Sequence, residues 1–136
     1  MTPGQLKLRA EDEEDLAVFS ACLQDALVPV ADMMWLPQEK RFVVVANRFC
    51  WECDQEGRRI LSGVAFEGIE SVKTQGFSPA ERERILELLA LRRDGRAILF
   101  EFAGEARLRL EAEKISARID DLGETWPTAY RPHHPL

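Results

Sequence analysis

From residue 30 to residue 112 the chain is a series of strand-like segments separated by turn signals, and this feature limits its possible folds most. Seven segments combine β-branched or aromatic residues with alternating or continuous apolar positions. They are residues 30–36, 41–53, 60–66, 69–74, 85–93, 96–103 and 107–110. Asp94-Gly95 is the strongest two-residue hairpin signal in the chain. Strands joined by tight turns pair antiparallel, so this pattern predicts an antiparallel sheet that curls on itself.

Helical spacing appears on either side of this series of strands. After a short predicted strand at residues 5–9, apolar residues recur at intervals of three and four. These residues are Leu16, Phe19, Leu23, Ala26 and Leu27. Asp12 is the predicted N-cap of that first helix. A second helical run starts at Glu113, and its apolar residues are Ile115, Ile119 and Leu122. We expect this second helix to end at Gly123 and to close the open end of the sheet.

The predicted fold class is therefore α+β: a seven-stranded antiparallel barrel capped by a C-terminal helix, with an extra N-terminal strand and helix. The 136 residues form a single domain, because most domains hold roughly 100–150 residues. Residues 1–29 are the predicted N-terminal extension, and residues 30–123 the barrel with its capping helix. Residues 124–136 contain three prolines and form a predicted irregular tail.

The net charge of −6 is concentrated in one acidic cluster. Residues 11–15 are all Asp or Glu, and without them the chain has 19 acidic and 18 basic residues, a balance of −1. Carboxylates in the first turn suit the positive end of a helix dipole. An acidic docking patch or a divalent-cation site is the alternative. The overall acidity disfavours a general nucleic-acid binder or a basic membrane-surface protein.

The sequence predicts a protein of the bacterial cytoplasm. No apolar run approaches the ~18–20 residues that cross a bilayer, and residues 1–10 lack the apolar region of a signal peptide. We therefore expect no membrane insertion. Three cysteines are a low, odd number, which predicts free thiols.

Cys50 and Cys53 form a C-x-x-C pair, a spacing found in redox sites and in half of a zinc site. A redox pair needs a helix N-terminus, whereas this pair ends a predicted strand, on which residues three apart point to opposite faces. The other candidate zinc ligands are Cys22, His133 and His134. We expect no metal and no cofactor, with a redox or zinc site as the alternative at this pair.

We predict no catalytic residues. The two histidines lie in the predicted tail, where a general base lacks fixed geometry. No glycine-rich phosphate loop is present. Four carboxylates on or beside strands are predicted to face solvent; they are Glu67, Glu70, Glu101 and Glu111. Trp126 and Tyr130 are costly to leave exposed, so docking of the tail on the sheet is an alternative to a solvated tail.

Five arginines around the last predicted hairpins form the candidate site. They are Arg92, Arg93, Arg96, Arg107 and Arg109. Because their strands are neighbours in sequence, these side chains can share a surface. Such a patch would bind an anion or an acidic partner peptide, and the alternative is a solvated face.

The order of elements resembles the pleckstrin-homology-like fold, a partly open seven-stranded barrel with a C-terminal helix. Residues 61–72 and 98–122 carry this resemblance. Over nearly the whole length, the chain is also similar to a family of small alphaproteobacterial proteins defined as a domain of unknown function. Its signature is Leu6-Lys7-Leu8, Asp15-Leu16, residues 28–35 and Arg41-Phe42. That similarity implies no activity, whereas the pleckstrin-like resemblance implies an adaptor fold.

We accordingly expect a non-catalytic cytoplasmic protein-interaction or adaptor module with a protein partner. The alternative is a small-ligand-binding protein or minor enzyme that uses the barrel mouth and the tail histidines. A homodimer through an exposed strand edge or the N-terminal helix is a third possibility.

Overall fold

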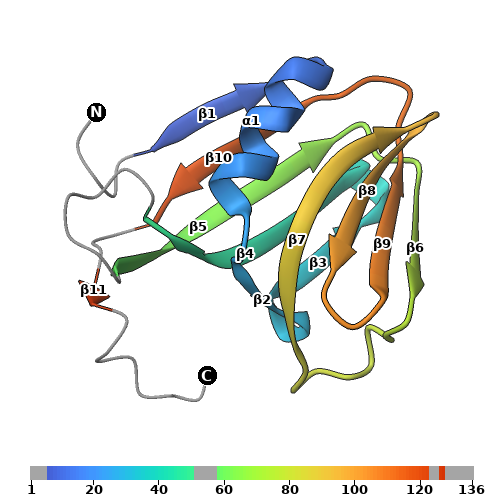
Figure 1. Cartoon of the computed structure of the whole chain (residues 1–136). Coiled ribbons are helices and arrows are strands. Elements are labelled where there is room, and N and C mark those ends of the chain that lie inside the picture. The colour runs from blue at the N-terminus through green and yellow to red at the C-terminus, as the bar shows by residue number, and fades with distance from the viewer. Residues whose placement is uncertain (1–5, 51–57, 123–125, 128–136) are drawn as a thin grey trace.

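The computed structural model describes residues 6–50, 58–122 and 126–127. Within these residues the chain forms one curved antiparallel sheet and one α-helix, α1 (Glu13–Leu23) (Figure 1). In chain order the strands are β1 (Lys7–Ala10), β2 (Leu27–Pro29), β3 (Met33–Leu36), β4 (Arg41–Phe49), β5 (Arg58–Glu67), β6 (Ser71–Gln75), β7 (Ile85–Asp94), β8 (Ala97–Phe102), β9 (Ala106–Glu111), β10 (Ala117–Asp121) and β11 (Trp126–Pro127). Two 3₁₀ turns, η1 (Val30–Asp32) and η2 (Pro37–Glu39), flank β3.

The sheet consists of two half-sheets joined by the short strand β2. The order is β1-β10-β5-β4-β2-β7-β8-β9-β6, while β3 pairs beside β4 and β11 beside β5. We call β1, β10, β5 and β4 the first half-sheet, and β7, β8, β9 and β6 the second. Leu27 in β2 lies opposite Asn47 in β4 and Glu87 in β7, so this strand connects the halves. Figure 1 shows β6 at the outer limit of the second half-sheet.

The inner faces of the two half-sheets form one apolar core. Along β4 the inward residues Phe42, Val44 and Ala46 are buried, as the two-residue period of a strand requires. The Phe66 and Phe100 rings meet edge to face across the core with centroids 5.4 Å apart. This aromatic contact joins β5 of the first half-sheet to β8 of the second.

The predicted N-cap of the first helix is confirmed. The Asp12 carboxylate accepts a hydrogen bond from the Asp15 N–H at 2.8 Å, and the Asp15 carboxylate accepts one from the Glu11 N–H at 2.9 Å. The acidic run therefore satisfies backbone donors at the helix start, where the dipole also favours negative charge. The helix ends earlier than predicted, because Asp25 takes a left-handed backbone conformation (φ 67°) before β2.

Helix α1 covers the core that the two half-sheets leave open. Its inward residues Leu16, Phe19 and Leu23 are fully buried, and it contacts β7, β1 and β4. The Ser20 hydroxyl accepts a hydrogen bond from the Leu91 N–H of β7 at 3.0 Å. The helix that seals this core is therefore the N-terminal one.

The predicted C-terminal capping helix is wrong. Residues 117–121 form β10, which pairs with β1 on one side and β5 on the other. Ile115, Ala117 and Ile119 are buried in alternation, so the apolar positions that suggested a helix also fit a strand. Backbone pairing on both sides of β10 decides between these two periods.

The predicted closed barrel is also wrong. The outermost strands, β1 and β6, do not pair with each other, so the sheet stays open. Side chains of α1 cover the apolar core, so the core is shielded from water although the sheet does not close around it. The described residues thus lack both features on which the pleckstrin-like resemblance depended, the C-terminal helix and the barrel. The antiparallel pairing and the N-terminal strand and helix were predicted correctly.

The predicted hairpin between β7 and β8 is confirmed, one residue further along than its signal. Asp94 pairs with Ala97, so Gly95 and Arg96 make the two-residue turn. Gly95 has φ 62°, a conformation that glycine adopts without steric cost. Among the described residues, no helix is long and apolar enough to cross a membrane.

Candidate functional site

The outer face of the second half-sheet carries most of the predicted arginine patch. Three rows of side chains cross β7, β8, β9 and β6 in register. In that strand order the rows are Ala90–Glu101–Arg107–Gln75, Arg92–Leu99–Arg109–Lys73 and Asp94–Ala97–Glu111–Ser71. We call this surface the arginine face. Part of it is a hollow of about 410 Å³ lined by Arg92, Arg107, Arg109, Lys73 and their neighbours.

Arg109 lies at the centre of the arginine face and is held by two carboxylates. Its Nη1 donates to Asp94 Oδ2 and its Nε to Glu111 Oε2, both at 2.8 Å. The hydrogen bond and charge of Arg109 lower the pKa of Asp94. The bonds to Asp94 and Glu111 raise the pKa of Arg109. Its guanidinium is therefore fixed in position, and the two carboxylates compensate its positive charge.

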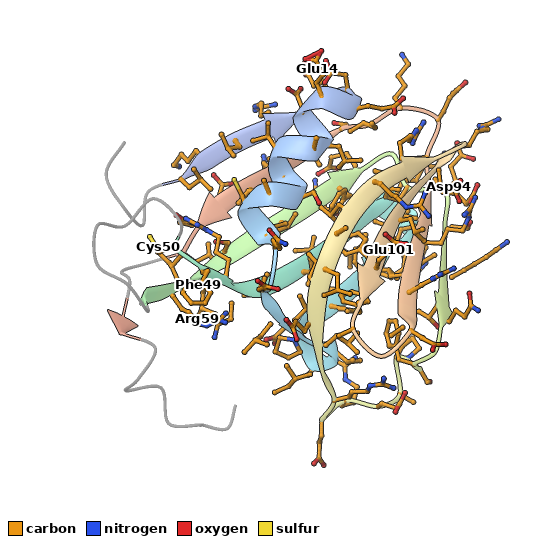
Figure 2. The ribbon with its side chains drawn as sticks, viewed as in Figure 1. Glu14, Phe49, Cys50, Arg59, Asp94 and Glu101 are labelled. Atoms are coloured by element: carbon orange, nitrogen blue, oxygen red, sulfur yellow. The ribbon has the colours of Figure 1, made fainter. Side chains whose placement is uncertain are left out.

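The cations at the β6 side of this face are less engaged. Arg92 pairs with Glu101 at 3.4 Å on the β7 side. Within the described part of the chain, Lys73 and Arg107 make no ion pair and no side-chain hydrogen bond. The carboxylates of the rows are already bound to Arg92 or Arg109. Figure 2 shows Asp94 near the tip of β7 and Glu101 further along the half-sheet. Positive charge is thus most available beside the free edge of β6.

Two of the five predicted patch residues lie elsewhere. Arg93 points to the opposite face of β7, where its Nη2 donates to the Glu113 carbonyl at 2.8 Å. Its Nη1 is buried beside a hollow of about 550 Å³ at the start of α1 and has no hydrogen-bond partner among the residues that the structure describes. Arg96 is exposed in the hairpin turn. Alternation along β7 separates Arg92 from Arg93, because adjacent strand residues face opposite sides.

A second charge cluster is buried at one end of the first half-sheet. Arg48 of β4 binds Asp121 of β10 through two bonds, Nη2 to Oδ2 at 2.7 Å and Nε to Oδ1 at 3.0 Å. Ser62 of β5 lies between them and donates to Asp121 Oδ1 at 2.5 Å. The Leu6 N–H donates to Asp121 Oδ2 at 2.9 Å. The cluster therefore connects β4, β5, β10 and the residue before β1.

Both charged side chains of this buried cluster are 0% exposed. Burial alone would raise the pKa of Asp121. Hydrogen bonds from Arg48, Ser62 and the Leu6 N–H outweigh burial and lower this pKa below its usual value. The cluster was not predicted from the sequence, although Arg48 continues the inward series of Phe42, Val44 and Ala46. Asp121 was assigned to the helix that does not form.

A third feature is a hollow of about 440 Å³ on the outer side of the sheet around Asn47. Asn47 is only 4% exposed, and its Oδ1 has no hydrogen-bond partner in the described part of the chain. The lining is mostly apolar, with an arginine and two carboxylates at the rim; it comprises Leu27, Pro29, Ala31, Asp32, Val45, Asn47, Leu61, Arg82, Glu83 and Ile85. A buried amide oxygen without a donor is uncommon, because such groups are nearly always paired.

Of the predicted C-x-x-C pair, only Cys50 lies within the described residues. It is buried and disulfide-bonded, which corrects the expectation of a free thiol at this position. Figure 2 shows it beside Phe49, over whose ring the Arg59 guanidinium lies 4.6 Å from the centroid. Cys53 lies outside the described residues. No three His, Cys, Asp or Glu side chains of the described part come together as metal ligands.

The remaining sequence-based candidates have mixed outcomes. His133, His134 and Tyr130 lie outside the described residues. Trp126 belongs to β11, whose backbone pairs with β5 opposite Arg59. The carboxylates predicted on outward strand faces include Glu67, which binds Arg41 at 2.9 Å. Glu101 and Glu111 belong to the arginine face.

The fold and its surfaces define a mostly antiparallel β protein that presents a face of arginines, one lysine and paired carboxylates on one half-sheet. The chain belongs to DUF2948, a family described as a protein of unknown function, whose model matches residues 6–134. No curated protein and no solved structure matches the chain significantly.

Proposed function

We propose that this protein is a non-catalytic interaction module of the bacterial cytoplasm whose arginine face binds an acidic segment of a protein partner. One observation carries the proposal. Lys73 and Arg107 have no ionic partner among the described residues, while neighbouring Arg92 and Arg109 are already bound to carboxylates. A partner carboxylate could therefore form an ion pair with Lys73 or Arg107, the two cations on the β6 side of the second half-sheet.

The mixed charge of the arginine face favours an acidic polypeptide over nucleic acid. Glu101 lies in the same row as Arg107, and Asp94 and Glu111 lie in the row next to Arg92, Arg109 and Lys73. These three carboxylates would repel a regular array of phosphates. The net charge of −6 acts in the same direction at longer range. A partner segment with spaced carboxylates can instead pair with Lys73 and Arg107, because Glu101 is bound to Arg92 and both Asp94 and Glu111 are bound to Arg109.

The test uses a fluorescein-labelled decaglutamate and measures fluorescence anisotropy as salt is increased. We expect binding that weakens with salt and falls at least tenfold in the double variant Lys73→Glu, Arg107→Glu. The matched control is Lys7→Glu, Lys114→Glu, which changes the net charge equally at exposed sites away from the face. Equal loss in both double variants, or tighter binding of a DNA 20-mer through the same residues, would overturn the proposal.

The hollow around Asn47 favours a second candidate function, binding of a small neutral ligand. Its mostly apolar walls suit an apolar group, and a rotation of the Asn47 side chain would let its buried Oδ1, unpartnered among the described residues, accept a hydrogen bond from a ligand donor. A thermal-shift screen of small amides and alcohols tests this candidate. A ligand that stabilises the wild type and leaves Asn47→Val unchanged supports it, and a screen without such a ligand counts against it.

A further inference from the structure

The second half-sheet ends at β6, and the side of this strand that faces away from β9 is its free edge. This strand pairs with β9 on one side, and the strand order ends there. Figure 1 shows β6 as the outermost strand of that half, in yellow-green. An edge strand exposes a row of backbone N–H and C=O groups that another strand can bind.

The pairing pattern identifies which backbone groups face that edge. The Ala112 N–H donates to the Arg96 carbonyl at 2.8 Å, which fixes the alternation of bonds between β8 and β9. Even-numbered residues of β9 therefore bond to β8, and its odd-numbered residues bond to β6. Their β6 partners are Ser71, Lys73 and Gln75. The N–H and C=O groups of Val72 and Thr74 consequently face away from β9, towards the free edge.

The β6 side chains favour different residues on the two faces of an added strand: charged residues on one face and apolar residues on the other. Lys73 points to the arginine face, whereas Val72 packs against the core on the inner face. In an added strand, the residue opposite Lys73 would lie on the arginine face, within a Debye length of Arg107. Opposite charges directly across two strands stabilise pairing, so this position favours Asp or Glu. The residues opposite Val72 and Thr74 favour apolar side chains.

We propose that the partner's acidic segment binds as an added β-strand along the free edge of β6, with acidic and apolar residues in alternation. This inference rests on the proposed function, because it specifies how the arginine face engages its partner. A second copy of this chain suits the edge less well. Antiparallel β6–β6 pairing centred on residue 73 would place Lys73 opposite its own copy, and like charges across strands are destabilising.

The peptide Thr-Glu-Val-Glu-Val-Glu-Thr, labelled with fluorescein, tests the added strand by anisotropy. In an antiparallel added strand, the orientation that this peptide tests, its Val N–H groups would bond to the β6 edge, whereas its Glu N–H groups would point away. N-methylation of both Val residues should weaken binding at least tenfold. N-methylation of two Glu residues is the matched control and should change affinity less than threefold.

A protein variant tests the same geometry from the other side. Thr74→Pro removes the edge-facing N–H while keeping the ladder to β9, since proline is tolerated on edge strands in this orientation. We expect at least tenfold weaker binding of the alternating peptide, with Thr74→Ala as control. Urea denaturation checks that the variant folds; if it does not, the N-methylated peptides on the wild type decide.

The outcomes separate this inference from the function on which it rests. If both N-methylated peptides bind equally, but Lys73→Glu, Arg107→Glu still abolishes binding, the added strand is wrong and the acidic partner stands. If no acidic peptide binds the wild type, both proposals fail. A homodimer that Thr74→Pro converts to monomer in analytical ultracentrifugation would also overturn the added strand, because a second copy would then occupy the edge.

Discussion

The buried cluster and the arginine face each contain a short arginine–aspartate ion pair, but one pair is buried and the other is exposed to solvent. The Arg48–Asp121 pair of the first half-sheet and the Arg109–Asp94 pair of the second have N–O distances of 2.7 and 2.8 Å. The side chains of the first pair are 0% exposed, whereas Arg109 is 37% and Asp94 48% exposed. Bond length alone therefore says little about what each pair contributes.

Solvent makes the difference between the clusters. In the buried cluster, removing one partner takes a compensating charge from a group that is away from water, which is far more costly than losing a screened surface pair. On the arginine face, water replaces any lost partner, so its charges are free to exchange one partner for another. The first half-sheet thus uses charge to fix strand positions, and the second keeps charge available for binding.

The largest expected effect comes from breaking the buried pair. Asp121→Asn keeps the shape of the side chain but removes the buried carboxylate charge to which Arg48 donates two bonds, so we expect about 3–5 kcal/mol lower free energy of unfolding. Urea denaturation measures it, with Asp94→Asn as the exposed control. A loss below about 1 kcal/mol, the range of an exposed pair, would show that water reaches Arg48.

Acid should weaken the protein through the same carboxylate. The folded-state pKa of Asp121 is lowered, while the unfolded value is about 3.9. Its contribution is therefore fully present above about pH 4 and disappears as pH falls through the folded pKa. Urea denaturation between pH 6 and pH 2 should show the stability difference between wild type and Asp121→Asn shrinking below pH 4. A constant difference across that range would contradict the lowered pKa.

Replacing both buried charges should cost less than removing one. Arg48→Met, Asp121→Leu removes both charges of this ion pair together, and apolar replacements of a buried ion pair are often neutral or stabilising. We expect the free energy of unfolding to lie within about 2 kcal/mol of wild type. Differential scanning calorimetry and urea denaturation can test this. A loss as large as that of Asp121→Asn would mean that the bonds to Ser62 and Leu6 are what the fold requires.

The smallest effect is expected on the arginine face. Arg92→Ala removes the exposed ion pair with Glu101 and should lower the free energy of unfolding by less than about 1 kcal/mol. The same denaturation assay measures it in low and high salt, and the difference should shrink as salt screens the pair. A salt-independent loss above about 2 kcal/mol would place Arg92 among the structural residues and remove the contrast between the clusters.

Much of the fold was predictable from periodicity, and the failures have a common cause. Strands such as β4 and β8 contain enough β-branched and aromatic residues to exclude a helix. Residues 113–122 do not, because Ile115 and Ile119 are four apart and satisfy both a helical and a strand period. Propensity cannot resolve that ambiguity, and pairing with β1 and β5 resolves it.

The candidate site was predictable only in part for a related reason. Arg92, Arg107 and Arg109 were predicted to share a surface, and they do. Their neighbour Lys73 was missed, because it lies more than thirty positions from Arg107 in the sequence and reaches the patch only through the β6–β9 pairing. Arg93 was wrongly included because the alternation along β7 was not applied to the pair Arg92-Arg93.

The sequence by itself determined the N-terminal helix and its cap, the antiparallel hairpins and the concentration of acidity at residues 11–15. These features depend on residues a few positions apart, so local chemistry suffices to define them. Only the tertiary structure decided that residues 117–121 are a strand, that the sheet stays open, and that Arg48 meets Asp121. These outcomes depend on contacts between residues far apart in the chain, where burial and backbone pairing outweigh local preference.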